Sequence, residues 1–211
     1  MSLVKETWFD LTQSFALDNK ISEKLYLEIE KRYSEKHRYY HTLEHLNSLI
    51  ELVNTYKDKV VNRPYVLFSL YYHDIVYNTL KSNNEEKSAD LAKKRLNTFI
   101  ENKELVNSVD KLIIATKKHI VADDINNFDS LFFLDCDLAI LGSNRERYIT
   151  YTEQIRNEYK IYPDIMYKKG RIKVLEHFLQ MDSIYKTPEI KQKFENQAID
   201  NMKYELSILN S

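Results

Sequence analysis

The feature of this sequence that most limits its fold is the scarcity of glycine, with 2 glycines in 211 residues. Globular proteins usually contain about 7% glycine. Antiparallel sheets use glycine in hairpin turns and at bulges, so a barrel, a sandwich or a propeller is disfavoured. Phosphate-binding loops need several glycines close together, which excludes a Walker A loop and a Rossmann fingerprint. We therefore predict an all-α protein whose helices end at polar caps, at prolines and at Gly142 and Gly170.

Length, charge and cysteine content narrow the class further. A chain of 211 residues suits one domain and can bury a sizeable core. Its 31 Lys+Arg nearly cancel its 32 Asp+Glu, which argues against a protein that coats nucleic acid. The single cysteine, Cys136, fits a reducing compartment, and neither a signal peptide nor a membrane-spanning run is visible. These features predict a cytoplasmic protein with no nucleic-acid and no membrane partner.

Apolar residues recur at helical spacing along most of the chain. We expect about ten helices joined by short loops, which form a single domain over residues 1–211. Thr42 is a predicted N-cap, and Pro64 is suited to the first turn of a helix over 64–77. A further apolar helix is expected over 130–142, closed by Gly142.

The segment 64–77 shows a conflict between polarity and burial. It is apolar on nearly all sides, which is typical of a helix in the middle of a protein. Yet it contains His73 and Asp74 side by side, and no Lys or Arg lies between Pro64 and Leu80. An ionised carboxylate in such surroundings costs several kcal/mol unless it is compensated.

Two other segments place polar residues next to the core. The apolar run 131–141 contains Asp135 and Asp137, which are about 200° apart on a helical wheel. We therefore expect only one of them to reach the same centre as Asp74. His41 and His45 are one helical turn apart, on a face that borders the core.

A divalent cation would resolve these conflicts together. Two neutral imidazoles and two carboxylates carry a charge of −2, and this donor set suits Mn, Fe, Co, Ni or Zn and can hold Mg. Four protein ligands would leave coordination positions for water or substrate, as in a catalytic site. Each motif also has an ordinary structural interpretation: a His-Asp pair is common at helix caps, and either aspartate could pair with Arg156 or Arg171.

The order His…His-Asp…Asp on an all-helical chain resembles the HD superfamily of metal-dependent phosphohydrolases. The matching segments are 40–45 (Tyr-His-Thr-Leu-Glu-His), 72–74 (Tyr-His-Asp) and 134–138 (Leu-Asp-Cys-Asp-Leu). Four more segments are similar to a stand-alone bacterial branch of predicted HD phosphohydrolases: 84–89, 115–119, 137–142 and 155–159. The resemblance implies an HD-type helical bundle with a metal-site core over about 38–142 and the C-terminal helices 144–210 packed on it.

The resemblance also implies a ligand set for one divalent ion, namely His45, His73, Asp74 and Asp137. The segment 40–45 is similar to that of cyclic-nucleotide phosphodiesterases, and by this analogy His45 ligates and His41 is the general acid. The choice between His41 and His45 stays open at this point, as does the choice between Asp135 and Asp137.

Further residues receive catalytic or binding roles from the same resemblance. The ion would lower the pKa of a bound water, and Asp74 would orient that water. Glu85 is a candidate general base, or only a favourable charge at a helix N-terminus. The candidate phosphate-binding side chains are Arg38, Lys117, His119 and Arg156. Arg156 could instead pair with a neighbouring helix.

We therefore expect hydrolysis of a phosphate ester or phosphoanhydride of a nucleotide or a related small molecule. One alternative is a metal-binding regulatory or ligand-binding HD module without turnover. Another is a two-metal HD oxygenase or phosphodiesterase, whose relatives carry two extra ligands, whereas His119 is the one histidine between Asp74 and Asp137. A third is a purely structural helical protein. The sequence does not determine the substrate, the identity of the metal or whether the chain forms a homodimer.

Overall fold

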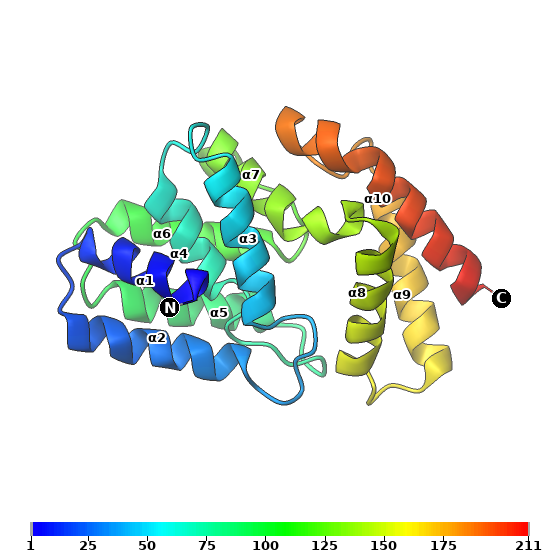
Figure 1. Ribbon diagram of the computed structural model, residues 1–211, viewed down its shortest axis with the longest axis horizontal. Coiled ribbons are helices and arrows are strands. Elements are labelled where there is room, and N and C mark those ends of the chain that lie inside the picture. Colours follow the sequence, from blue (N-terminus) through cyan, green and yellow to red (C-terminus); the bar gives the residue numbers. More distant parts are fainter. Residues whose placement is uncertain (1, 211) are drawn as a thin grey trace. The chain divides into compact units, whose positions relative to one another are not determined.

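The computed structural model describes residues 2–210, and this part of the chain is all-α, with no strand (Figure 1). The predicted class and the expected number of about ten helices are confirmed. The α-helices are α1 (Leu3–Gln13), α2 (Asn19–Tyr33), α3 (Leu43–Thr55), α4 (Arg63–Tyr72), α5 (Asn84–Leu96), α6 (Lys103–Ala115), α7 (Phe128–Asp137), α8 (Arg145–Glu158), α9 (Asp164–Leu179) and α10 (Pro188–Leu209). Two short 3₁₀ helices are η1 (Asp123–Ile125) and η2 (Ala139–Gly142). None of the helices within 2–210 combines the length and the apolar composition that a membrane crossing requires.

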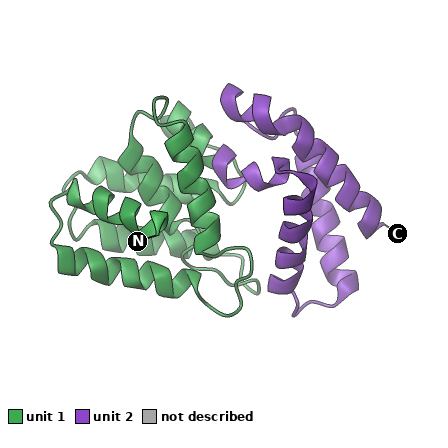
Figure 2. Ribbon diagram, in the orientation of Figure 1, with its two compact units in different colours: residues 1–134 green, residues 135–211 purple. Residues whose placement is uncertain are grey.

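The chain divides into two compact units, residues 1–134 and 135–211 (Figure 2). Unit 1 contains α1 to α6, and unit 2 contains α8 to α10. The division falls inside α7, which is itself one continuous helix. The single HD-type domain expected over 1–211 stays a prediction.

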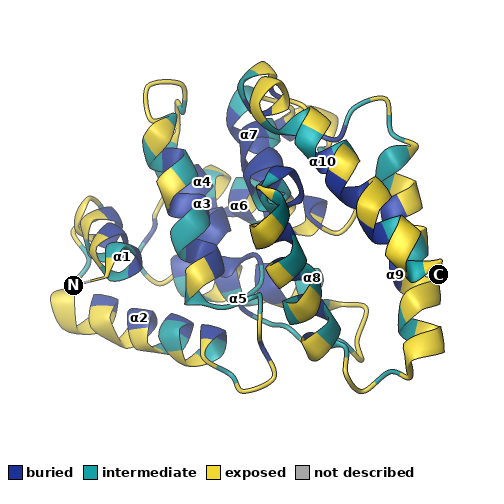
Figure 3. Ribbon diagram, turned by 45° about the vertical axis from the view of Figure 1, so that its right-hand side comes forward, coloured by how far each residue is buried: buried dark blue, intermediate teal, exposed yellow. Residues whose placement is uncertain are grey.

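Unit 1 is built around α4, which is buried on all sides, as its apolar sequence predicts (Figure 3). Helices α3, α5 and α6 pack against α4. Trp8 of α1 meets Phe68 and Tyr71 edge to face, with ring centroids 6.3 and 5.0 Å apart. Its indole N–H donates to the carbonyl oxygen of Ser22 at 3.1 Å, which ties α1 and α2 to α4.

The helix expected over 64–77 ends five residues earlier than predicted. His73 is the C-cap of α4, and its backbone N–H donates to Ser69 at 2.9 Å. Beyond it, the carbonyl oxygens of Asp74 and Ile75 accept hydrogen bonds from the Arg38 guanidinium at 2.7 and 3.0 Å. The N–H of Val76 donates to the hydroxyl of Ser88 at 3.1 Å and not to the carbonyl of Tyr72, so the helical bonding pattern stops there. His73 and Asp74 therefore lie at the end of α4 and not in its middle.

The other helix starts and ends follow the sequence more closely. The Thr42 side chain caps α3 by accepting from the N–H of Glu44 at 3.3 Å, and Pro64 lies in the first turn of α4. The segment 130–142 is not one helix, because α7 ends at Asp137 and η2 follows, with Gly142 as its last residue.

Unit 2 is held by an ion pair that is buried among its three long helices. Arg171 of α9 donates to both carboxylate oxygens of Glu205 in α10, at 2.8 and 3.0 Å. The hydroxyl of Tyr148 in α8 donates to the same carboxylate at 2.5 Å. The sequence suggested Arg171 as a possible partner for Asp135 or Asp137, but the structure pairs it with Glu205.

Gly142 ends η2 as expected, whereas the expectation that a helix ends at Gly170 is wrong, because Gly170 lies inside α9. The two glycines also have opposite surroundings, and this gives a paired prediction. A Cβ at Gly142 would lie 2.5 Å from Cβ and 2.6 Å from the carbonyl oxygen of Phe194, whereas a Cβ at Gly170 would meet nothing within 4 Å. We expect Gly142→Ala to lower the free energy of unfolding by about 1–3 kcal/mol, because the backbone of α10 blocks the methyl group. Gly170→Ala should raise it by about 0.5–1 kcal/mol, because alanine favours the helix. Urea unfolding of both variants checks this, and effects of the same sign would contradict it.

Candidate metal centre

Two histidine rings meet in the core of unit 1. His45 lies in the first turn of α3, on the side that also buries Leu46 and Leu49, and is 4% exposed. His73 caps α4 and is 1% exposed. The Nε2 atoms of the two rings are 3.2 Å apart.

The tautomer of His73 follows from its backbone partner. Nδ1 of His73 lies 2.8 Å from the carbonyl oxygen of Leu70. Because a carbonyl only accepts, Nδ1 is assigned the proton, and Nε2 of the neutral ring then presents its lone pair. Metal-ligating histidines are commonly oriented in this way by a carbonyl behind the ring.

Asp74 adds a carboxylate to the histidine ring nitrogens of this group within unit 1. Its Oδ2 lies 3.1 Å from Nε2 of His73 and 3.7 Å from Nε2 of His41. The side chains of His41 and Asp74 are 18% and 19% exposed, so this side of the group reaches solvent. The His41 ring packs against Tyr77 and Tyr40, with centroids 4.3 and 5.0 Å apart. Sequence reasoning missed these two tyrosines as the neighbours of His41, because aromatic packing across loops leaves no periodic signal.

Helix α7 carries the fourth residue of the group. Phe133 of α7 packs edge-on against the His73 ring, with centroids 5.7 Å apart. Asp137 follows Phe133 by one helical turn on the same face of α7. His45, His73, Asp74 and Asp137 each offer one ligand atom, and these atoms all lie within 4.8 Å of one another. The four residues form a cluster that could hold a metal ion, and they are the set predicted from the sequence.

Asp135 has a structural role inside unit 2. Its carboxylate accepts from the N–H groups of Lys186 and Thr187, at 2.7 and 2.6 Å, and from the Thr187 hydroxyl at 2.6 Å. Thr187 is the N-cap residue of α10, so Asp135 holds the start of that helix. Burial raises the pKa of Asp135, and the hydrogen bonds from Thr187 and Lys186 act in the opposite direction. Between the two aspartates that the sequence left open, Asp137 is the one in the cluster.

Two other predicted site residues, Glu85 in the first turn of α5 and Lys117 after α6, lie close to each other. Lys117 forms an ion pair with Glu86 and donates to the carbonyl oxygen of Ser82 at 2.6 Å. Glu85 lies 3.9 Å from the same ammonium group. His119 is in the turn after α6, with a φ of 51°. The roles of Glu85 as general base and of Lys117 and His119 as phosphate contacts stay predictions.

Arg156 in unit 2 adopts the structural arrangement that the sequence left as its alternative. Its guanidinium donates to Asp164 at the start of α9, at 2.6 and 3.1 Å. It also donates to the carbonyl oxygens of Tyr159 and Tyr162, at 3.0 and 3.1 Å. Arg156 thus organises the turn between α8 and α9, and its contact with phosphate stays a prediction.

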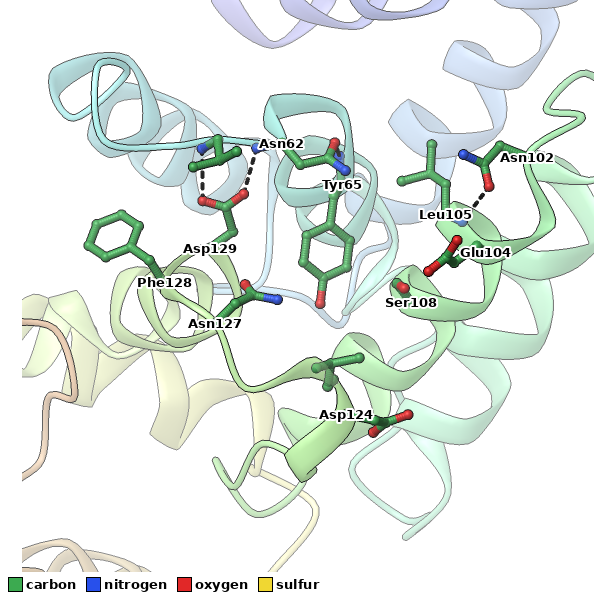
Figure 4. Close-up of a pocket in the computed structure, with 12 residues that line it drawn as sticks. Asn62, Tyr65, Asn102, Glu104, Leu105, Ser108, Asp124, Asn127, Phe128 and Asp129 are labelled. Atoms are coloured by element: carbon green, nitrogen blue, oxygen red, sulfur yellow. Dashed lines mark hydrogen bonds between the residues drawn. The ribbon is translucent and has the colours of Figure 1, made fainter.

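A pocket of about 520 Å³ lies beside the first turns of α4 and α7 (Figure 4). The histidines and aspartates of the cluster do not line it. Tyr65, which lines it, precedes His73 by eight residues, or about 12 Å of helix. Asp129, also in the lining, accepts from the backbone N–H groups of Val61 and Asn62, at 3.0 and 2.6 Å. No Lys, Arg or His is among the residues that line this pocket, so its lining offers no positively charged partner to a phosphate.

The sequence matches no protein-family model, and neither curated proteins nor solved structures include a significant match.

Proposed function

We propose that this chain is a metal-dependent phosphohydrolase of the HD type. It would cleave a phosphate ester or phosphoanhydride of a nucleotide or another small molecule. The observation that carries the proposal is the convergence of two imidazoles and two carboxylates, with their ligand atoms within 4.8 Å of one another. The order of these residues along the chain, which resembles the HD superfamily, supports the same assignment.

The donor set fits a divalent cation. Nε2 of His73, which is assigned a lone pair, faces Nε2 of His45 at 3.2 Å and Oδ2 of Asp74 at 3.1 Å. The lone pair of His73 and the carboxylate of Asp74 repel each other unless a proton or a cation lies between them. Two neutral histidines and two carboxylates balance one M²⁺, and mixed nitrogen and oxygen donors suit Mn, Fe, Co, Ni and Zn.

When bound, such an ion polarises a phosphoryl oxygen and lowers the pKa of a water molecule. The residues of the chain would contribute position and protons. The carbonyl oxygen of Leu70 holds the His73 ring in its ligating tautomer. His41, which is partly exposed and lies 3.7 Å from Asp74, is placed to hold a proton at Nε2 and to donate it to the leaving oxygen.

A variant of His41 separates proton donation from metal binding. In His41→Gln we expect the metal-dependent hydrolysis rate to fall by about 10²–10⁴-fold, the usual contribution of a general acid. Metal affinity should stay close to that of the wild type, since His41 is not in the ligand cluster. His177→Gln, which changes an exposed histidine of α9, is the matched control and should leave both quantities unchanged.

The assay uses protein stripped with a chelator, then supplied with Mn²⁺, Co²⁺, Ni²⁺, Zn²⁺ or Mg²⁺. The substrates are p-nitrophenyl phosphate, its bis ester and a panel of nucleotides. Hydrolysis that requires one of these metals supports the proposal. Three results would overturn the proposal. One bound ion per chain without turnover of any substrate would indicate a binding module, and two ions per chain would indicate a two-metal site. A protein that binds no ion would be a purely structural one.

A further inference from the structure

Arg38 is a buried residue next to the candidate site, and its guanidinium binds backbone carbonyl oxygens. Its guanidinium side chain is 0% exposed. Nη1 donates to the carbonyl oxygens of Asp74 and His41, at 2.7 and 3.3 Å. Nη2 donates to the carbonyl oxygen of Ile75 at 3.0 Å. One side chain thus joins the turn that carries His41 to the turn that carries Asp74.

The guanidinium is itself held from three sides. Its Nε donates to the Glu35 carboxylate at 3.3 Å. Its central carbon lies 5.0 Å from the ring centroid of Tyr33 and 5.4 Å from that of Tyr77. The Tyr77 ring also packs on the His41 ring, with centroids 4.3 Å apart. A displacement of Arg38 would therefore move both the backbone and the aromatic support of His41.

The carbonyls that Arg38 binds require an arginine. Five N–H donors in a rigid plane can serve three separate carbonyl oxygens, whereas a lysine ammonium is a compact charge on a flexible chain. The carbonyls of Asp74 and Ile75 follow the last turn of α4, where the helix dipole favours a cation. A buried guanidinium without such partners would be costly.

We propose that Arg38 is a positioning residue of the metal centre. Through the carbonyls of His41 and Asp74 it sets the separation of 3.7 Å between the His41 ring and the Asp74 carboxylate, and it keeps that carboxylate 3.1 Å from Nε2 of His73. This inference rests on the proposed function, because it concerns the same centre. It differs from the phosphate contact expected for Arg38 from the sequence, since the donors described above point to carbonyl oxygens.

The test compares Arg38→Met and Arg38→Lys with a matched control, Arg95→Met. Arg95 is also an arginine of unit 1 with a carboxylate partner, since it donates to Glu28 at 2.7 and 2.8 Å, but it makes none of the carbonyl contacts described for Arg38. The probe is Co²⁺, followed by its dissociation constant and its visible absorption spectrum in folded protein. We expect Co²⁺ affinity to fall by about 10–100-fold in Arg38→Met, the range seen when a partner that orients a metal ligand is lost. The spectrum should change as well, Arg38→Lys should be intermediate, and Arg95→Met should match the wild type in both.

The outcomes separate this inference from the proposed function. A wild-type protein that binds no Co²⁺ overturns the proposed function itself. A wild-type protein that binds Co²⁺, together with a folded Arg38→Met that has unchanged affinity and spectrum, overturns the role of Arg38 alone. A raised KM with unchanged Co²⁺ affinity would also overturn it, because that result indicates a substrate contact. If Arg38→Met does not fold, the same criteria apply to Arg38→Lys.

Discussion

Asp74→Asn is expected to abolish metal binding and hydrolysis while the helices remain. The asparagine has the same size but removes the carboxylate whose Oδ2 lies 3.1 Å from Nε2 of His73 and 3.7 Å from Nε2 of His41. We expect metal affinity to fall by more than about 100-fold, beyond the range typical for partners that only orient a ligand. The fold should persist, because Asp74 follows the end of α4 and is 19% exposed. Metal titration, the hydrolysis assay and far-UV circular dichroism check these three expectations.

A matched control exists for this substitution. Asp110 of α6 is also in unit 1, is 20% exposed and pairs with Lys93 at 3.8 Å. Asp110→Asn removes the same charge at the same degree of burial and should leave metal affinity and the hydrolysis rate unchanged. Equal behaviour of the two variants, or activity retained in Asp74→Asn, would be incompatible with the proposed centre.

Glu205→Ala is expected to be the most destabilising single substitution considered for unit 2. It leaves the Arg171 guanidinium buried without the two hydrogen bonds at 2.8 and 3.0 Å, and it removes the acceptor of Tyr148. Burial and the charge of Glu205 raise the pKa of Tyr148, so its hydroxyl stays a donor at neutral pH. Removal of one partner from a buried ion pair typically costs about 3–5 kcal/mol. Urea unfolding, monitored by circular dichroism, measures this loss.

The control is the ion pair between Arg156 and Asp164, which is also in unit 2. The Asp164 side chain is 77% exposed, so Asp164→Ala should cost no more than about 1 kcal/mol. Arg171→Met combined with Glu205→Met should recover part of the stability that Glu205→Ala loses, because no unpaired charge is left in the core. A cost for Glu205→Ala as small as that for Asp164→Ala would contradict this description of the core.

The sequence predicted those parts of the site that depend on local pattern. His73 and Asp74 stand out in an apolar segment that is indeed buried. The spacing of His41 and His45 marked the two as a pair, and the resemblance to the HD superfamily favoured His45 as the ligand. The scarcity of glycine indicated an all-α chain before any helix was assigned. These inferences hold because burial and helical periodicity are properties of short segments.

The features that sequence reasoning missed depend on contacts between distant segments. Helix α4 ends at Tyr72, where the N–H of Val76 donates to the hydroxyl of Ser88, and Arg38 then takes the carbonyls of Asp74 and Ile75 from more than thirty positions earlier. The carboxylate of Asp135 accepts hydrogen bonds from Thr187, and Arg171 forms an ion pair with Glu205. A local sequence pattern cannot predict which residues pair in this way, because any arginine or carboxylate of the chain could be the partner.

Anomalous diffraction from crystals grown with Co²⁺ would locate the ion at the metal centre itself. We expect one strong cobalt peak per chain, within bonding distance of Nε2 of His45, Nε2 of His73 and the carboxylates of Asp74 and Asp137. A well-ordered chain that shows no peak among these four side chains at saturating Co²⁺ would contradict this expectation.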